Sequence, residues 1–120
     1  MIMRVSVMVL GAPAESSASR LALAVLEAAW AAGAELDTVF LYHKGTYAAL
    51  NRARQNDEWR RWSQLASAAG LRCVVCRTAW LSQMGAAATE IVPPFRLGGL
   101  ADWLGACERS DRVLRFGSLS

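Results

Sequence analysis

Cysteine is the residue type whose spacing in this 120-residue chain first suggests chemistry, because Cys73 and Cys76 form a C-x-x-C string. Such a string can mark a redox pair or half of a zinc site, which Cys107 and His43 could in principle complete. It lies, however, in an apolar run and not on the glycine-containing turn of a zinc knuckle. Residues three apart in a strand are about 10 Å apart on opposite faces, whereas a disulfide needs Cα atoms within about 7 Å. We therefore interpret Cys73 and Cys107 as core residues and expect no metal.

Cys76 differs from the other cysteines because it ends the apolar run, where the chain turns into a predicted helix over residues 77–84. A thiol there meets the positive end of the helix dipole and the Arg77 guanidinium. Both favour the thiolate that a nucleophilic or sulfur-carrying cysteine needs. On position alone, it is equally possible that Cys76 is a third buried core cysteine without a chemical role. Tyr42 and His43 end another predicted strand and could assist Cys76 if the two strands are neighbours, although a lone loop histidine is more often solvated.

Alternating strands and helices must position these residues. The predicted strands are residues 5–10, 36–42, 71–76 and 112–116, and the predicted helices end at residues 32, 69, 84 and 109. We expect Ser16, Ser17 or Ser19 to cap the first helix and Asp57 the second, with a weak helical turn over 46–54. Residues 86–99 are predicted to be a loop with a short extended piece at 91–92. This pattern predicts one α/β domain over residues 1–120, a flavodoxin-like parallel sheet of four or five strands with helices on both faces.

Composition excludes several classes of protein. With 54% hydrophobic and 19% charged residues, the chain is neither disordered nor fibrous. The basic residues behind its net charge of +3 are scattered, so we expect no direct nucleic-acid binding. No apolar run approaches the roughly 20 residues of a membrane span. Three cysteines favour a reducing, cytoplasmic location, and five tryptophans indicate surface that an oligomer would cover.

The loop from Gly11 to Ser19 follows a strand and opens a helix, as phosphate-binding loops do. It lacks both the glycine spacing of a dinucleotide site and the lysine of a P-loop, and Glu15 would repel a phosphate. Helix capping is the favoured interpretation. A small flavin- or nucleotide-binding module remains the weaker alternative, and we expect no cofactor.

Four segments in order carry a resemblance to a known family. They are the N-terminal Met-Arg-Val strand, Leu36–Tyr47 with its Tyr-His-Lys-Gly-Thr-Tyr end, Gly70–Cys76, and Gly99–Gly117 with its Asp-Arg-Val-x-x-Phe-Gly strand. Together they resemble the DsrE/TusD family of DsrEFH-like sulfurtransferase subunits. Two departures are a helix after Cys76 that is one residue longer, without the arginine that often precedes its closing Gly85, and a shorter loop over 86–98.

The resemblance implies a sulfur-relay protein in which Cys76 carries sulfur as a persulfide. It also implies hexamers with DsrF/TusC-like and DsrH/TusB-like subunits, a TusA-type sulfur donor and a DsrC/TusE-type acceptor. The sulfur would serve tRNA thiolation or sulfur oxidation. The alternative within this family is a structural subunit with a silent cysteine. No cofactor is needed, because a thiolate is both nucleophile and carrier.

Overall fold

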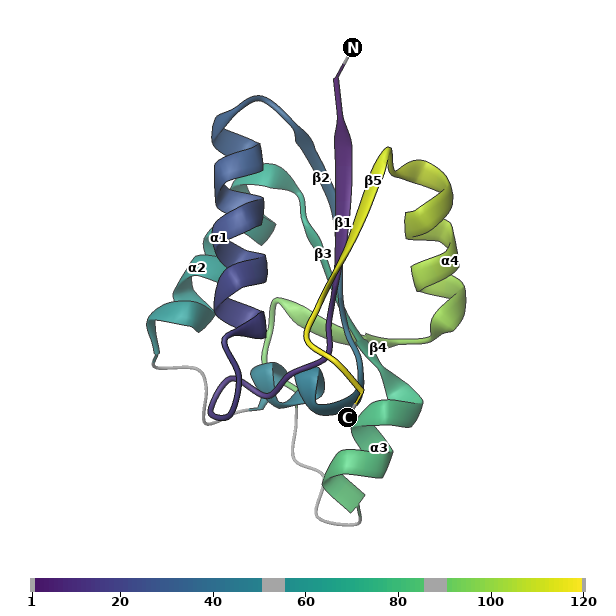
Figure 1. Ribbon diagram of the computed structural model, residues 1–120. Helices are drawn as coiled ribbons and strands as arrows, with labels where there is room; N and C mark the ends of the chain where they lie inside the picture. Colours follow the sequence, from purple (N-terminus) through teal and green to yellow (C-terminus); the bar gives the residue numbers. More distant parts are fainter. Residues whose placement is uncertain (1, 51–55, 86–90, 120) are drawn as a thin grey trace.

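The computed structural model describes residues 2–50, 56–85 and 91–119, and strands and helices alternate along them (Figure 1). In chain order the elements are β1 (Arg4–Val9), α1 (Ala18–Ala31), β2 (Glu35–Leu41), the 3₁₀ helix η1 (His43–Ala49), α2 (Asp57–Ala69), β3 (Arg72–Cys76), α3 (Arg77–Met84), β4 (Phe95–Gly98), α4 (Leu100–Arg109) and β5 (Arg112–Phe116). Among these residues no helix has the length and apolar character needed to cross a bilayer.

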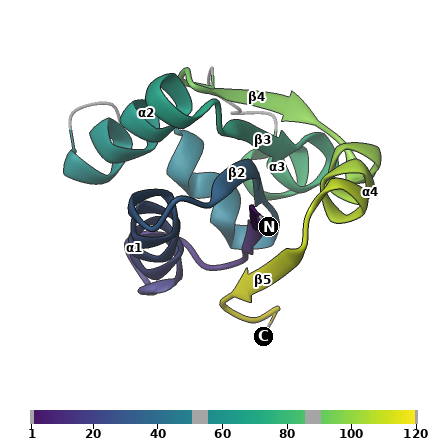
Figure 2. The ribbon, with the colours of Figure 1, turned by 90° about the horizontal axis from the view of Figure 1, so that it is seen from above.

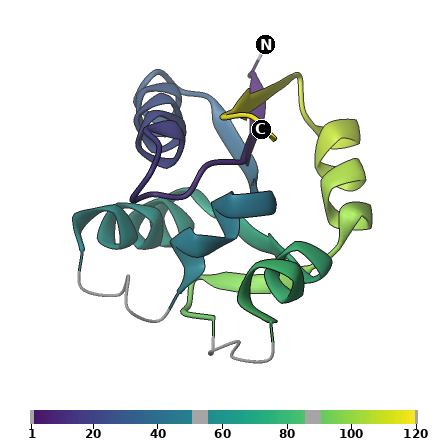
Figure 3. The ribbon, with the colours of Figure 1, turned by 60° about the horizontal axis from the view of Figure 1, so that its bottom comes forward.

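The five strands form one parallel sheet in the order β4-β3-β2-β1-β5. Seen from above, α1 and α2 cover one face of the sheet and α4 covers the other (Figure 2). Helix α3 lies beyond the carboxyl ends of the strands, beside η1 (Figure 3). The predicted fold class, a parallel α/β sheet with helices on both faces, is confirmed, with five strands.

Three local predictions were wrong. Strand β4 lies in the predicted loop, while Ile91 forms only an isolated bridge with Leu50. The prolines and glycines around β4 made this segment resemble a loop in the sequence. They are compatible with a short edge strand, because such a strand forms backbone hydrogen bonds on one side only. The α2 cap is Asn56, whose Oδ1 accepts from the Trp59 N–H at 2.8 Å, and not Asp57. The predicted turn over 46–54 is the earlier helix η1, and residues 51–54 lie outside the described part.

The two faces of the sheet hold two hydrophobic clusters. The larger one fills the space under α1 and α2, with Val7, Val39 and Val75 from the strands and Leu23 and Trp62 from the helices. The smaller one lies under α4. Its buried members are Phe40, Val74, Cys76 and Ala79, against which Met8, Tyr42 and Trp103 pack.

A change of register divides strand β2. Val5 pairs with Leu36 and Val7 pairs with Val39, so that Asp37 and Thr38 both lie opposite Ser6. This is a β-bulge, in which one extra residue is accommodated on one strand. The Thr38 N–H donates to Ser6 Oγ at 3.2 Å. Leu36 and Val39 therefore both face the larger cluster, and Phe40 faces the smaller one.

The tryptophans leave less surface uncovered than composition alone predicts. Trp62 and Trp80 are 1% and 3% exposed, and Trp59 and Trp103 are half-buried. Of the five, all within the described residues, Trp30 is the one that is exposed, at 42%. The tryptophans are therefore a weaker argument for an oligomer than their number suggested.

Candidate functional site

Cys76 occupies the boundary between a strand and a helix. It is the last residue of β3 and the N-cap of α3, and it pairs with Gly98 of the edge strand β4. Its side chain is buried, at 3% exposure. In parallel α/β sheets ligands bind beyond the carboxyl ends of the strands, so this is the edge at which chemistry is expected.

Aromatic rings from two other elements form the surroundings of Cys76. Phe40 of β2 is stacked against Trp103 of α4, with ring centroids 5.7 Å apart, and against Tyr42, with centroids 6.3 Å apart. All three belong to the Cys76 cluster. The sulfur thus lies among apolar groups that exclude bulk water, at the end of a strand and the start of a helix.

The residues predicted to assist Cys76 are placed differently from one another. Strands β2 and β3 are neighbours, as the interpretation of Tyr42 and His43 required, and Tyr42 packs in the Cys76 cluster. His43 is half-buried with a positive φ of 51°, and its carbonyl oxygen accepts from Thr46 Oγ1 at 2.9 Å. Within the described residues, no hydrogen bond joins the His43 ring to Cys76. Arg77 is exposed, without an ion pair in that part of the chain.

The other two cysteines have different surroundings. Cys73 belongs to the cluster under α1 and α2, so it faces away from Cys76 and no disulfide can join them. Burial raises the pKa of the Cys73 thiol to about 12. Cys107 is half-buried on α4. No group of three metal-ligating side chains gathers anywhere in the described residues.

Helix α4 reaches the site through a tight turn after β4. Asp102 Oδ2 accepts from the Gly99 N–H at 2.9 Å, and Arg96 Nη2 donates to Asp102 Oδ1 at 3.3 Å. The Gly99 hydrogen bond, against the opposing effect of burial, and then Arg96 lower the pKa of Asp102. A Cβ on Gly98 would lie 2.5 Å from Asp102 Oδ2 and 2.6 Å from Val74 Cγ1, so this position leaves no room for a side chain.

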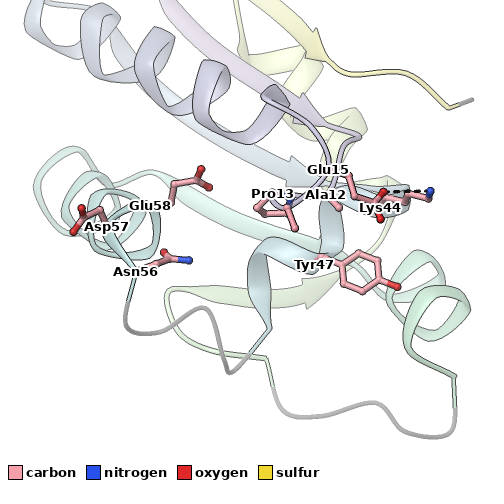
Figure 4. Close-up of a pocket in the computed structure, with 9 residues that line it drawn as sticks. Ala12, Pro13, Glu15, Lys44, Tyr47, Asn56, Asp57 and Glu58 are labelled. Carbon is pink, nitrogen blue, oxygen red and sulfur yellow. Dashed lines mark ion pairs between the residues drawn. The ribbon is translucent and has the colours of Figure 1, made fainter.

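A cavity of about 670 Å³ also opens at the carboxyl edge of the sheet, lined by the β1–α1 loop, η1 and the start of α2 (Figure 4). Its lining includes Glu15, Asp57 and Glu58 but not Cys76. Lys44 is paired with Glu15 at 3.6 Å, and Ser19 Oγ donates to Glu58 Oε2 at 3.1 Å. This acidic lining and the engaged hydroxyl oppose the alternative that the loop binds a flavin or nucleotide phosphate.

A small parallel α/β domain with one cysteine at the carboxyl edge, at a strand-to-helix boundary, is the class of protein that these observations define. Residues 3–116 match the model of the DsrE/DsrF-like family, and the chain belongs to that family. It is 34% identical to the "Putative sulfurtransferase DsrE" of Allochromatium vinosum, with 88% of this chain and 92% of that protein covered. It is 32% identical to the "Sulfurtransferase TusD homolog" of Pseudomonas aeruginosa, with 88% and 91% covered.

The fold is also that of a solved structure. The crystal structure of the ychN protein from E. coli superposes with a TM-score of 0.69 at 22% identity, covering 97% of this chain and all of that one. The names of the relatives support a sulfur-relay role in general. The family match confirms the resemblance inferred from the four sequence segments.

Several neighbours of the site were not predicted. The aromatic contact between Phe40 and Trp103 joins residues 63 positions apart, and Asp37 anchors the far end of α4. One signal was present in the sequence: Asp37 and Thr38 are polar residues in an otherwise apolar strand segment. Polar side chains in a buried strand are almost always hydrogen-bonded, so these two residues indicated hydrogen-bond partners elsewhere in the fold.

Proposed function

We propose that the protein is a sulfurtransferase that carries sulfur as a persulfide on Cys76. The observation that supports this most directly is the position of Cys76 at the junction of β3 and α3, within an apolar and aromatic cluster. The relatives' names point to the same chemistry. Cys73 faces the main core, and Cys107 lies on α4, away from the strand ends.

The transfer is a thiol exchange without net redox change. The Cys76 thiolate attacks the outer sulfur of a donor protein's persulfide, a new S–S bond forms on Cys76, and the donor S–S bond breaks with its electron pair leaving on the donor thiolate. An acceptor cysteine then attacks the outer sulfur of the Cys76 persulfide, and Cys76 leaves as thiolate. A TusA-type donor and a DsrC/TusE-type acceptor are the partners that the family resemblance suggests.

The described surroundings combine an apolar cluster, which keeps water from the sulfur, with polar groups at the start of α3 that would offset the cost of a buried negative charge. The first amides of α3 and the Arg77 guanidinium would stabilise its negative charge. Phe40, Tyr42 and Trp103 exclude solvent that would otherwise carry soluble thiols to the persulfide. Tyr42 and His43 are the groups from which a proton could be supplied.

Intact-mass measurement after incubation with a sulfur donor tests this function. We expect an adduct of about 32 Da, one sulfur atom, on the wild-type protein. It should disappear in Cys76→Ser and persist in Cys73→Ser and Cys107→Ser, which are the matched controls. An adduct that remains in Cys76→Ser, or no adduct on the wild type, would refute the proposal.

A structural subunit with a silent cysteine is the second candidate, and the 3% exposure of Cys76 favours it. The same mass measurement separates the two, because a silent cysteine takes up no sulfur. A sulfur-carrying Cys76 must instead become accessible when the site opens.

We also propose that the chain works in an oligomer with DsrF/TusC-like and DsrH/TusB-like subunits. Leu100 and Leu104 on α4 are 55% and 63% exposed, and Leu81 on α3 is 55% exposed. Burial of such side chains on association is favourable by about 25 cal/mol per Å² of apolar surface. We expect the same surface to pair copies of the chain when the other subunits are missing, so light scattering on the isolated chain should find a particle larger than 13.0 kDa. A stable monomer at micromolar concentration would contradict this self-association.

A further inference from the structure

The carboxylate of Asp37 is buried and surrounded by cations. Its side chain is 2% exposed, and it accepts two hydrogen bonds from Arg109, from Nε and Nη2, each at 2.9 Å. Thr38 Oγ1 donates to it at 2.7 Å, and Arg72 and Arg4 lie at 3.5 and 3.7 Å. Such a two-point guanidinium–carboxylate pair fixes direction as well as distance.

The β-bulge creates the place where this pair forms. Because Asp37 and Thr38 share one pairing position opposite Ser6, the strand presents polar groups beside Arg4 and Arg72, the first residues of β1 and β3. Ser6 Oγ is also 2.8 Å from Ser110 Oγ, at the end of α4. The last turn of α4 is therefore held to the sheet by an ion pair and a hydroxyl contact.

Helix α4 has little apolar burial to hold it without these contacts. Of its ten residues, Ala106 alone is fully buried, whereas Leu100 and Leu104 point outward. On the opposite face α1 buries five residues. Polar anchoring consequently carries a larger share of the docking of α4 than of α1.

The same helix connects the anchor to the sulfur site. Trp103, six residues before Arg109, stacks on Phe40 in the Cys76 cluster, and only the N-cap Gly99 separates α4 from Gly98, the β4 partner of Cys76. A helix released at its last turn would pivot about this junction. Trp103 would then move off the cluster.

We infer that Asp37 and Arg109 are positioning residues that act through α4: they hold Trp103 over the Cys76 cluster and so set how readily the sulfur is reached. This inference rests on the proposed function for its importance, but not for its test. The expected consequence is that loosening the anchor exposes Cys76 selectively.

The experiment compares Arg109→Met with Arg61→Met in the full chain. Arg61 makes a similar two-point pair with Glu27, joining α2 to α1 on the other face, and its side chain is about as exposed as that of Arg109. Iodoacetamide labelling, followed cysteine by cysteine by peptide mass, reports accessibility. We expect Cys76 to react about fivefold faster in Arg109→Met, the factor corresponding to about 1 kcal/mol of easier opening. The rate in Arg61→Met should match that of the wild type.

Arg109→Lys keeps the charge but replaces two directed hydrogen bonds with a single flexible donor, so its rate should fall between those of the wild type and Arg109→Met. An unchanged Cys76 rate in Arg109→Met and Arg109→Lys overturns the inference. Equal acceleration in Arg61→Met, or acceleration of Cys73 to the same degree, also overturns it, because both would mean general loosening. Labelling needs no sulfur transfer, so failure of the sulfur-adduct experiment is distinguishable from failure here.

Discussion

The two faces of the sheet are built in different ways. Under α1 and α2, side chains from both helices meet the strands in a cluster that includes Leu23, Leu26 and Trp62, each 1% exposed or less. Under α4 the buried cluster is four residues, and the last turn of the helix is held to β2 by the pair of Asp37 and Arg109. From this difference we expect stability to depend mainly on the face under α1 and α2, and access to the Cys76 sulfur on the face under α4. Cys73 faces the first and Cys76 the second.

The largest loss of stability should come from removing a large side chain from the cluster under α1 and α2. Trp62→Ala removes a side chain that is 1% exposed and is expected to lower the free energy of unfolding by about 3–5 kcal/mol. Trp103→Ala, from a half-buried position, should cost less than half of that. Urea unfolding of the two variants measures both. Equal losses would mean that the two faces contribute alike to stability.

Removing the charge of Asp37 should have the next largest effect. Burial alone would raise its pKa, but the hydrogen bonds from Arg109 and Thr38 and the charges of Arg109 and Arg72 lower it below 3.8. A lowered folded pKa gives stability that is complete above 3.8 and is lost as the pH falls below it through the folded value. Asp37→Asn should cost about 2 kcal/mol near neutral pH.

The check is to measure the free energy of unfolding of the wild type and of Asp37→Asn from pH 7 downward. The wild type should lose its advantage over Asp37→Asn below pH 3.8, where the carboxyl group becomes protonated. Glu27→Gln, which breaks the ion pair between α1 and α2, is the control on the other face. A constant difference between wild type and Asp37→Asn down to the acid transition would contradict the lowered pKa.

Crowding at Gly98 provides a smaller and more local effect. The added methyl group of Gly98→Ala meets Val74 and the Asp102 carboxylate, which must give up part of its hold on the start of α4. We expect a loss of about 1–2 kcal/mol, within the range for added methyl groups in packed sites. Hydrogen exchange should quicken in α4 and not in α1; uniform quickening in both would argue against a local role.

The smallest effect should be at Cys73. Its pKa of about 12 leaves almost no thiolate near neutral pH, and its side chain is buried. Native protein should therefore leave Cys73 unlabelled by iodoacetamide at pH 8 over times that label Cys107. Labelling of Cys73 in the native protein as fast as in urea would show that the face under α1 and α2 opens readily.

Local patterns in the sequence were enough to predict most strands and helices and to place Cys76 at a strand-to-helix boundary. Apolar runs between glycines predicted β1, β2, β3 and the helices between them, and the predicted boundary after Cys76 put this residue at the end of a strand and directly before a helix. Contacts between distant segments were not accessible in this way. The pairing of Asp37 with Arg109, 72 residues later, depends on a bulge that shifts the register by one residue and on where α4 crosses the sheet.

The pairing of the first strand with the last has a consequence for biosynthesis. Strand β5 is the last strand of the described residues, yet it pairs with β1: the Arg4 N–H donates to Asp111 Oδ2 at 2.8 Å and the Leu10 N–H to the Phe116 carbonyl at 2.9 Å. Strands β1, β2 and β3 are synthesised before β5, so they can pair with one another while β5 is still missing. A nascent chain therefore carries an open edge on β1 until β5 has been made and paired, and exposed edges invite pairing with other chains. The same edge is where a stalled or shortened chain would be expected to aggregate.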